Sequence, residues 1–183
     1  MNKRMIASLA VTALAVGLVA AITMSGDSPP RPTHQARVAN VETMAVTDLA
    51  DDHKLVGFAS DVFLGTVVKK RGTTMVDPLP ETQFDVRVLR TVKGSLAGDV
   101  VVSQQGGVDE QGTTVVIDDD SPLKVGKTYL FASRTNEATG WHTLIPRYGI
   151  VPVNAERNGT DLVERFFVAR AAEVPFAAGG PTG

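Results

Sequence analysis

The stretch Ser60–Leu96 contains two apolar runs joined by a proline-containing connection. The first run, Val62–Val68, is apolar at nearly every position, which is typical of a strand buried on both faces. In the second run, Phe84–Val88, apolar and charged side chains alternate, so we expect one buried face and one solvent-facing face. These two runs predict a hairpin in the core of the domain, with a loop at its tip over Gly72–Pro80.

Further short β-rich runs follow, each bounded by turn signals. With the first two, they bring the number of predicted strands to about eight. The later runs are Asp99–Gln104, Thr113–Ile117, Thr128–Ser133, His142–Ile145, Tyr148–Val153 and, after an Asn158–Gly159 turn, Asp161–Val168. Thr47–Val56 differs, because its acidic early turns and the Gly57 stop predict a short helix. The pattern predicts a mainly β fold, an antiparallel barrel or sandwich with one short N-terminal helix.

The N-terminal segment, residues 1–24, predicts export. Lys3 and Arg4 precede Met5–Met24, a run without a charged residue, and a basic end followed by an apolar run is the pattern of an export signal. A helix of about 20 apolar residues also suffices to cross a bilayer. The segment is therefore either a retained membrane anchor or a signal peptide cleaved near Ala21. In both cases the remainder of the chain is extracytoplasmic.

Composition divides the rest of the chain. Residues 25–45 read as a Pro-rich linker, since Ser25–Asn40 is rich in proline and small polar residues, which favour extended, solvated backbone. Residues 46–168 form the predicted β domain. Residues 169–183 are rich in alanine, glycine and proline, a composition that predicts a disordered tail.

Charge and cysteine content exclude several functions. The formal net charge is −2, so the chain lacks the general electrostatic footprint of a nucleic-acid-binding protein. It has no cysteine, which excludes disulfides, thiolate metal sites and thiol nucleophiles. No nucleic-acid partner is therefore predicted.

The order of these signals resembles a known family. The helix runs into ASDVFLGTV (59–67), and FDVRVL (84–89), VKG (92–94), GDVVV (98–102) and VGKTYLF (125–131) follow. Over Asp48–Val153 this pattern resembles the OB-fold domain of the TIMP/netrin-like superfamily, in the form found in secreted or membrane-anchored proteins of Gram-positive bacteria of the actinobacterial type. The resemblance implies an OB-like barrel. Animal inhibitors of that superfamily place an N-terminal cysteine on a protease zinc ion, and a chain without cysteine does not inherit that activity.

Asp118, Asp119 and Asp120 form the densest acidic cluster, with two further acidic residues shortly upstream. Because Ca²⁺ prefers several oxygen ligands, these aspartates are the candidate metal ligands of the chain. The spacing of an EF-hand is missing, and the alternative is a solvated turn that leads into Pro122. No other cofactor is predicted.

Histidines and serines form no complete catalytic motif. His34, His53 and His142 fall in the linker, the helix and a strand, without metal-binding spacing. G-x-S-x-G does not occur, and the S-x-x-K spacing of Ser121 and Lys124 falls in a predicted proline-containing turn. We therefore expect a non-enzymatic protein. The alternative is an envelope hydrolase or metal-dependent enzyme with dispersed catalytic residues, which His142 beside a serine or carboxylate in a pocket would indicate.

Lys69, Lys70 and Arg71 form the main basic patch, to which basic residues of the second run add. Aromatic residues make up only 5% of the chain, too few for the stacking platforms of nucleic-acid-binding barrels. Anionic wall polymer or lipid headgroups are the better partners for the patch. The alternative is that these residues are only solvated strand ends, without a binding role.

These observations predict a non-enzymatic binding or interaction domain in the cell envelope. The partner would be an unknown envelope protein or an anionic wall polymer, bound through the loops Arg71–Glu81 and Gln104–Asp120, since loops on rigid β scaffolds carry recognition. Inhibition of an extracellular protease is a further alternative.

Overall fold

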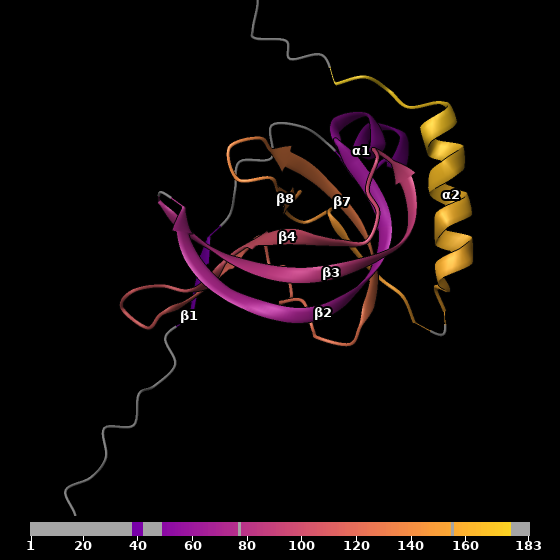
Figure 1. Ribbon diagram of the computed structural model, residues 1–183. Coiled ribbons are helices and arrows are strands. Elements are labelled where there is room, and N and C mark those ends of the chain that lie inside the picture. Colours follow the sequence, from indigo (N-terminus) through magenta and orange to yellow (C-terminus); the bar gives the residue numbers. More distant parts are fainter. Residues whose placement is uncertain (1–37, 42–48, 77, 155, 177–183) are drawn as a thin grey trace, which may run out of the picture. The chain divides into compact units, whose positions relative to one another are not determined.

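The computed structural model describes residues 38–41, 49–76, 78–154 and 156–176 (Figure 1). The predicted export segment, its cleavage near Ala21 and most of the predicted linker lie outside these residues. Among the described helices, none has the length and apolar character needed to span a bilayer.

The fold is mainly β, as predicted, with two short helices among the described residues. In chain order the elements are β1 (Val38–Val41), α1 (Asp52–Phe58), β2 (Asp61–Val76), β3 (Leu79–Lys93), β4 (Asp99–Gln105), β5 (Gly107–Val108), β6 (Thr114–Ile117), β7 (Thr128–Asn136), β8 (Trp141–Leu144), β9 (Ile150–Pro152) and α2 (Gly159–Ala171).

Five strands close into a barrel in the order β2-β3-β4-β8-β7, and pairing between β2 and β7 joins the two ends (Figure 1). All neighbours are antiparallel except β4 and β8, which are parallel. The prediction of an antiparallel barrel is therefore wrong for this one pair. The parallel pair arises because β8 forms an antiparallel hairpin with β7 and places its other edge beside β4.

The predicted hairpin is confirmed and is longer than expected. β2 and β3 pair up to Val76 and Leu79, so the predicted loop over Gly72–Pro80 is wrong. Thr73 and Thr74 lie within the ladder, where β-branched side chains fit the pleated surface well. Most of the predicted binding loop Arg71–Glu81 is therefore strand.

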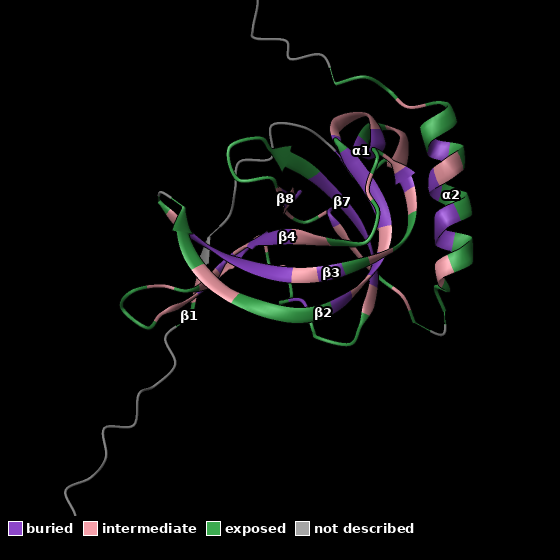
Figure 2. Cartoon of the chain, in the orientation of Figure 1, coloured by how far each residue is buried: buried purple, intermediate pink, exposed green. Residues whose placement is uncertain are grey.

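Both faces of the first half of β2 are buried, as predicted. Phe63 and Val67 point into the barrel, where they pack with Phe84 and Phe131. Val62 points the opposite way, into a second apolar cluster formed with the two helices. The alternation of a strand thus supplies two cores, one inside the barrel and one between the barrel and its helical cover. Figure 2 shows buried residues both in the barrel strands and along α2.

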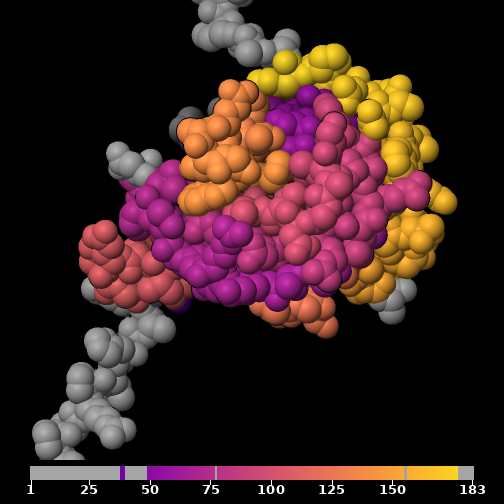
Figure 3. Space-filling model, in the orientation of Figure 1, coloured from indigo at the N-terminus to yellow at the C-terminus, as the bar shows by residue number. Residues whose placement is uncertain are grey.

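Residues 159–171 form the helix α2, so the predicted strand Asp161–Val168 is wrong. Asn158 does not make a hairpin turn; its side-chain oxygen accepts a hydrogen bond from the Asp161 N–H at 3.0 Å and caps the helix. The buried side chains recur at helical spacing: Leu162, Val163, Phe166 and Ala169. They cover one side of the barrel, where the space-filling view shows α2 in yellow (Figure 3).

The predicted disordered tail is wrong as far as Phe176. The Val174 N–H donates to the His53 carbonyl at 3.1 Å, and the Phe176 ring meets the Phe58 ring edge-on with centroids 4.8 Å apart. Gly57 permits this approach, because a Cβ there would collide with the Val174 carbonyl oxygen. Residues 177–183 lie outside the described part of the chain.

Two predicted boundaries shift at the N-terminal side. The short helix is confirmed, but it begins at Asp52 because the Asp51 carboxylate accepts hydrogen bonds from the His53 and Lys54 N–H groups. Within the predicted linker, Val38–Val41 forms β1, which pairs with β6 in parallel and lies in a separate sheet with β5.

Candidate functional site

The loop between β6 and β7 and the loop between β8 and β9 contain strained backbone. Asp118 and Asp119 have φ angles of 48° and 60°, and Arg147 has 67°. These three are the non-glycine residues with positive φ in the described segments. Such conformations cost roughly 1–3 kcal/mol each and cluster at binding and active sites.

Arg147 connects the two strained loops. Its backbone N–H donates to Asp120 Oδ2 at 2.9 Å, and its Nη2 lies 4.0 Å from Asp118 Oδ1. The two aspartates therefore face a common partner that is remote in the sequence. This geometry holds the acidic loop against the segment that precedes β9.

The environment of Asp120 shifts its protonation. Burial raises the pKa of this carboxyl above its ordinary value of 3.8. The hydrogen bond from the Arg147 N–H lowers the pKa by less, and the nearby Asp118 charge raises it further. The net shift is upward, so the folded protein disfavours the ionised form.

Asp120 lines a cavity of about 490 Å³ at one side of β7 and β9. The lining combines apolar side chains with a few polar groups: Asp120, Ser121, Pro122, Lys124, Lys127, Thr128, Tyr129, Ile150, Pro152, Val153 and Asn154. The Lys124 N–H donates to the Tyr129 hydroxyl at 3.2 Å, which fixes the turn over the cavity. A pocket with convergent polar groups and a perturbed carboxyl is the usual form of a ligand site.

The three predicted metal ligands do not converge on one point. Asp118 and Asp120 face Arg147, and the described residues contain no group of three or more His, Asp or Glu side chains suited to a metal ion. Calcium binding by Asp118, Asp119 and Asp120 stays a prediction.

The predicted basic patch lies on β2, on exposed strand. Arg71 Nε pairs with Asp85 at 2.7 Å, and Arg87 of β3 pairs with Asp99 at 3.1 Å. Lys69 and Lys70 are exposed and take part in no ion pair among the described residues. Binding of an anionic polymer by Lys69, Lys70 and Arg71 stays a prediction, with Arg71 already paired in part.

His142 lies beside a carboxylate at the end of the barrel interior. Its Nδ1 is 3.1 Å from Asp61 Oδ2, and Thr135 Oγ1 donates to the same oxygen at 2.7 Å. His142 is 8% exposed and Asp61 5%. Ser133 is also buried nearby on β7, opposite Asp61, and its hydroxyl has no hydrogen-bond partner in the described structure.

This cluster lacks the arrangement of a hydrolase. Thr135 donates its hydroxyl to Asp61, so it is not activated by the histidine, and Ser133 makes no hydrogen bond to His142. A nucleophile needs both an activating base and access to substrate, and none of these residues lines the cavity beside Asp120. The cluster links β2, β7 and β8 as a buried polar contact.

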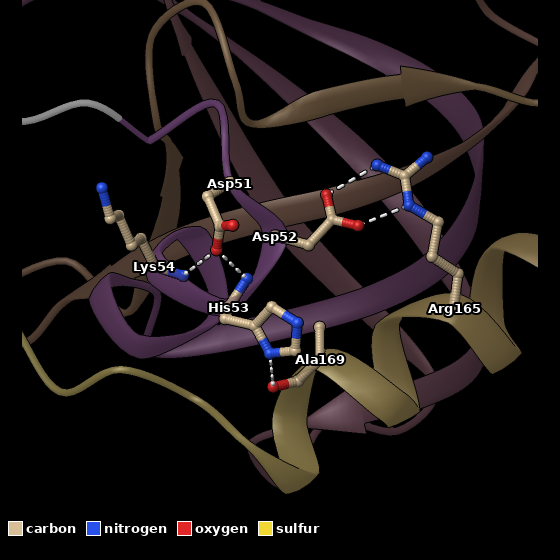
Figure 4. Close-up of polar contacts among 6 residues, drawn as sticks. All are labelled: Asp51, Asp52, His53, Lys54, Arg165 and Ala169. Carbon is tan, nitrogen blue, oxygen red and sulfur yellow. Dashed lines mark hydrogen bonds and ion pairs between the residues drawn. The ribbon is translucent and has the colours of Figure 1, made fainter.

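His53 has a comparable structural role where α1 meets α2 (Figure 4). Its Nδ1 lies 3.2 Å from the Ala169 carbonyl oxygen, near the end of α2. The Arg165 guanidinium forms a bidentate ion pair with the Asp52 carboxylate, in which Nη2 lies 2.6 Å from Oδ1. That hydrogen bond raises the pKa of Arg165. These contacts hold α2 onto α1.

Sequence reasoning found Asp120 through its acidic neighbours but missed Lys124, Lys127 and Arg147. The two lysines flank Gly126, whose positive φ of 79° marks a tight turn, and this Lys-x-Gly-Lys turn was a usable signal. Arg147 had no such sequence signal, because no local pattern indicates an arginine with a left-handed backbone conformation.

No protein-family model matches the sequence, and a search of curated proteins finds no matching relative. The candidate site is therefore assigned from its geometry alone.

Proposed function

We propose that this protein is a non-enzymatic binding domain of the cell envelope, built on an OB-type barrel, with its ligand site in the cavity beside Asp120. The five-stranded closure of β2, β3, β4, β8 and β7 supports the OB assignment, since OB folds are five-stranded barrels that use their loops for binding. The basic end and apolar run of residues 1–24 support export.

One observation carries the proposal. Asp120, the carboxyl with a raised pKa, lines the cavity and accepts a hydrogen bond from Arg147, one of the three strained non-glycine residues of the described segments. A fold retains strained backbone only where the surrounding structure fixes it, and such sites tend to serve recognition or catalysis. The cavity contains no histidine, cysteine or paired carboxylates, and no hydrogen bond joins the Ser121 and Lys124 side chains within the described structure, so recognition is the better supported of the two.

The partner is an envelope protein or an anionic wall polymer, and capture with a blocked cavity tests this. Ser121 lines the cavity, and within the described structure its hydrogen bond is the one that its backbone carbonyl accepts from the Gln104 side chain. Ser121→Trp therefore fills the cavity without removing a contact. Val125→Trp, on the same loop but outside the lining, is the matched control.

Wild-type protein and the Val125→Trp variant should capture the same component from envelope extract, or sediment with the same purified wall polymer. Ser121→Trp should lose this binding while its thermal unfolding is unchanged. Undiminished binding by a folded Ser121→Trp variant would place the ligand site elsewhere.

A further inference from the structure

The cavity beside Asp120 carries excess positive charge. Lys124 and Lys127 both line it, both are exposed, and neither forms an ion pair with any residue that the structure describes. Their ammonium groups are therefore available to a ligand. Asp120 is the single acidic residue of the lining.

The acidic side of the site is already engaged. Asp120 accepts a hydrogen bond from the Arg147 N–H, and burial raises its pKa. The Asp118 carboxylate lies 4.0 Å from the Arg147 guanidinium and is not part of the lining. An incoming ligand thus meets two lysines without an ion-pair partner among the described residues and one carboxyl that already accepts a hydrogen bond.

The remaining lining is largely apolar. Pro122, Ile150, Pro152 and Val153 provide aliphatic surface, and the Tyr129 ring adds an aromatic wall. The volume of about 490 Å³ falls within the roughly 300–1,000 Å³ of typical small-molecule sites. A small molecule fits a site of this class.

We infer that the cavity takes a ligand with an anionic group, a carboxylate or a phosphate, attached to an apolar body. The anion would lie between Lys124 and Lys127, and the body would pack on Ile150 and Val153. This inference rests on the proposed function, because it assigns a ligand class to the same cavity.

NMR titration of the full chain with three probes tests it. The probes are 3-phenylpropionate, phenyl phosphate and the neutral 3-phenylpropionamide, so the first two also distinguish the two sources of charge. Exposed ion pairs contribute up to about 1 kcal/mol, and we expect at least one anion to bind about five-fold more tightly than the amide at low salt. Signals of Tyr129 and Val153 should shift, and the preference should shrink in high salt.

The double variant Lys124→Gln/Lys127→Gln should bind the anions no better than the amide. Lys69→Gln/Lys70→Gln removes the same charge outside the cavity and should keep most of the preference. Equal binding of anion and amide by the wild type would overturn the charge assignment and leave the cavity as a ligand site. Absence of binding by all three probes at millimolar concentration would overturn both the charge assignment and the proposed ligand site.

Discussion

Replacement of Phe166 by alanine tests the assignment that most alters the predicted fold, the helix α2. Phe166 is 1% exposed and lies in the cluster between the helices and the barrel. Truncation of a buried phenylalanine costs about 3–5 kcal/mol, since it removes apolar contacts and leaves a cavity. For a chain of this size that loss lowers Tm by roughly 6–20 °C. Val168→Ala, at a side chain 68% exposed, should change stability by less than about 0.5 kcal/mol.

The pair of variants separates helix from strand. In a strand, Phe166 and Val168 would lie on one face and truncations would have comparable effects. In α2 they lie on opposite sides, and of the two only Phe166 is buried in the core. Urea unfolding followed by far-ultraviolet circular dichroism measures both free energies. Equal losses for the two variants, or a loss below about 1 kcal/mol for Phe166→Ala at unchanged m-value, would refute the packing described here.

Two further predictions concern the polar sites. Because burial raises the pKa of Asp120, ionisation of this carboxyl opposes folding at neutral pH, and this penalty is relieved as the pH falls through the folded pKa toward 3.8. Asp120→Asn keeps an acceptor for the Arg147 N–H, so its free energy of unfolding in urea at pH 7 should be at least that of wild type. The difference in free energy between the two proteins should narrow toward pH 4. A variant less stable by the same amount at every pH would contradict this. Asp61→Ala should lower stability by about 3 kcal/mol, because it leaves the buried His142 and Thr135 groups without their shared acceptor, and should leave cavity binding intact; loss of binding without loss of stability would reverse the roles assigned to the two sites.

Several strands could be predicted because their signals are local. The apolar run after Asp61 and the alternation around Val86 place both strands of the hairpin, and the turn at Gly126 bounds the start of β7. α2 could not be predicted in the same way. Pairs of apolar residues such as Leu162–Val163 and Phe166–Phe167 satisfy a helical and an extended pattern alike, and the barrel surface that selects the helix is formed by residues far away in the sequence.

The candidate site was predictable only in part. Acidic density indicated Asp118–Asp120, but the chemistry expected there was a metal site. Arg147, which both aspartates face, comes from another loop. The apolar wall formed by Ile150 and Val153 reaches the cavity only because β9 pairs with β7.

Local sequence patterns suffice to predict the mainly β character, the short capped helix and the central hairpin, since each depends on the periodicity and turn chemistry of neighbouring residues. The tertiary structure decided the parallel contact of β4 with β8, the helix at residues 159–171 and the cavity beside Asp120. Each of these depends on burial against surfaces that are distant in the chain, and the free energy of that burial exceeds the local preferences of the backbone.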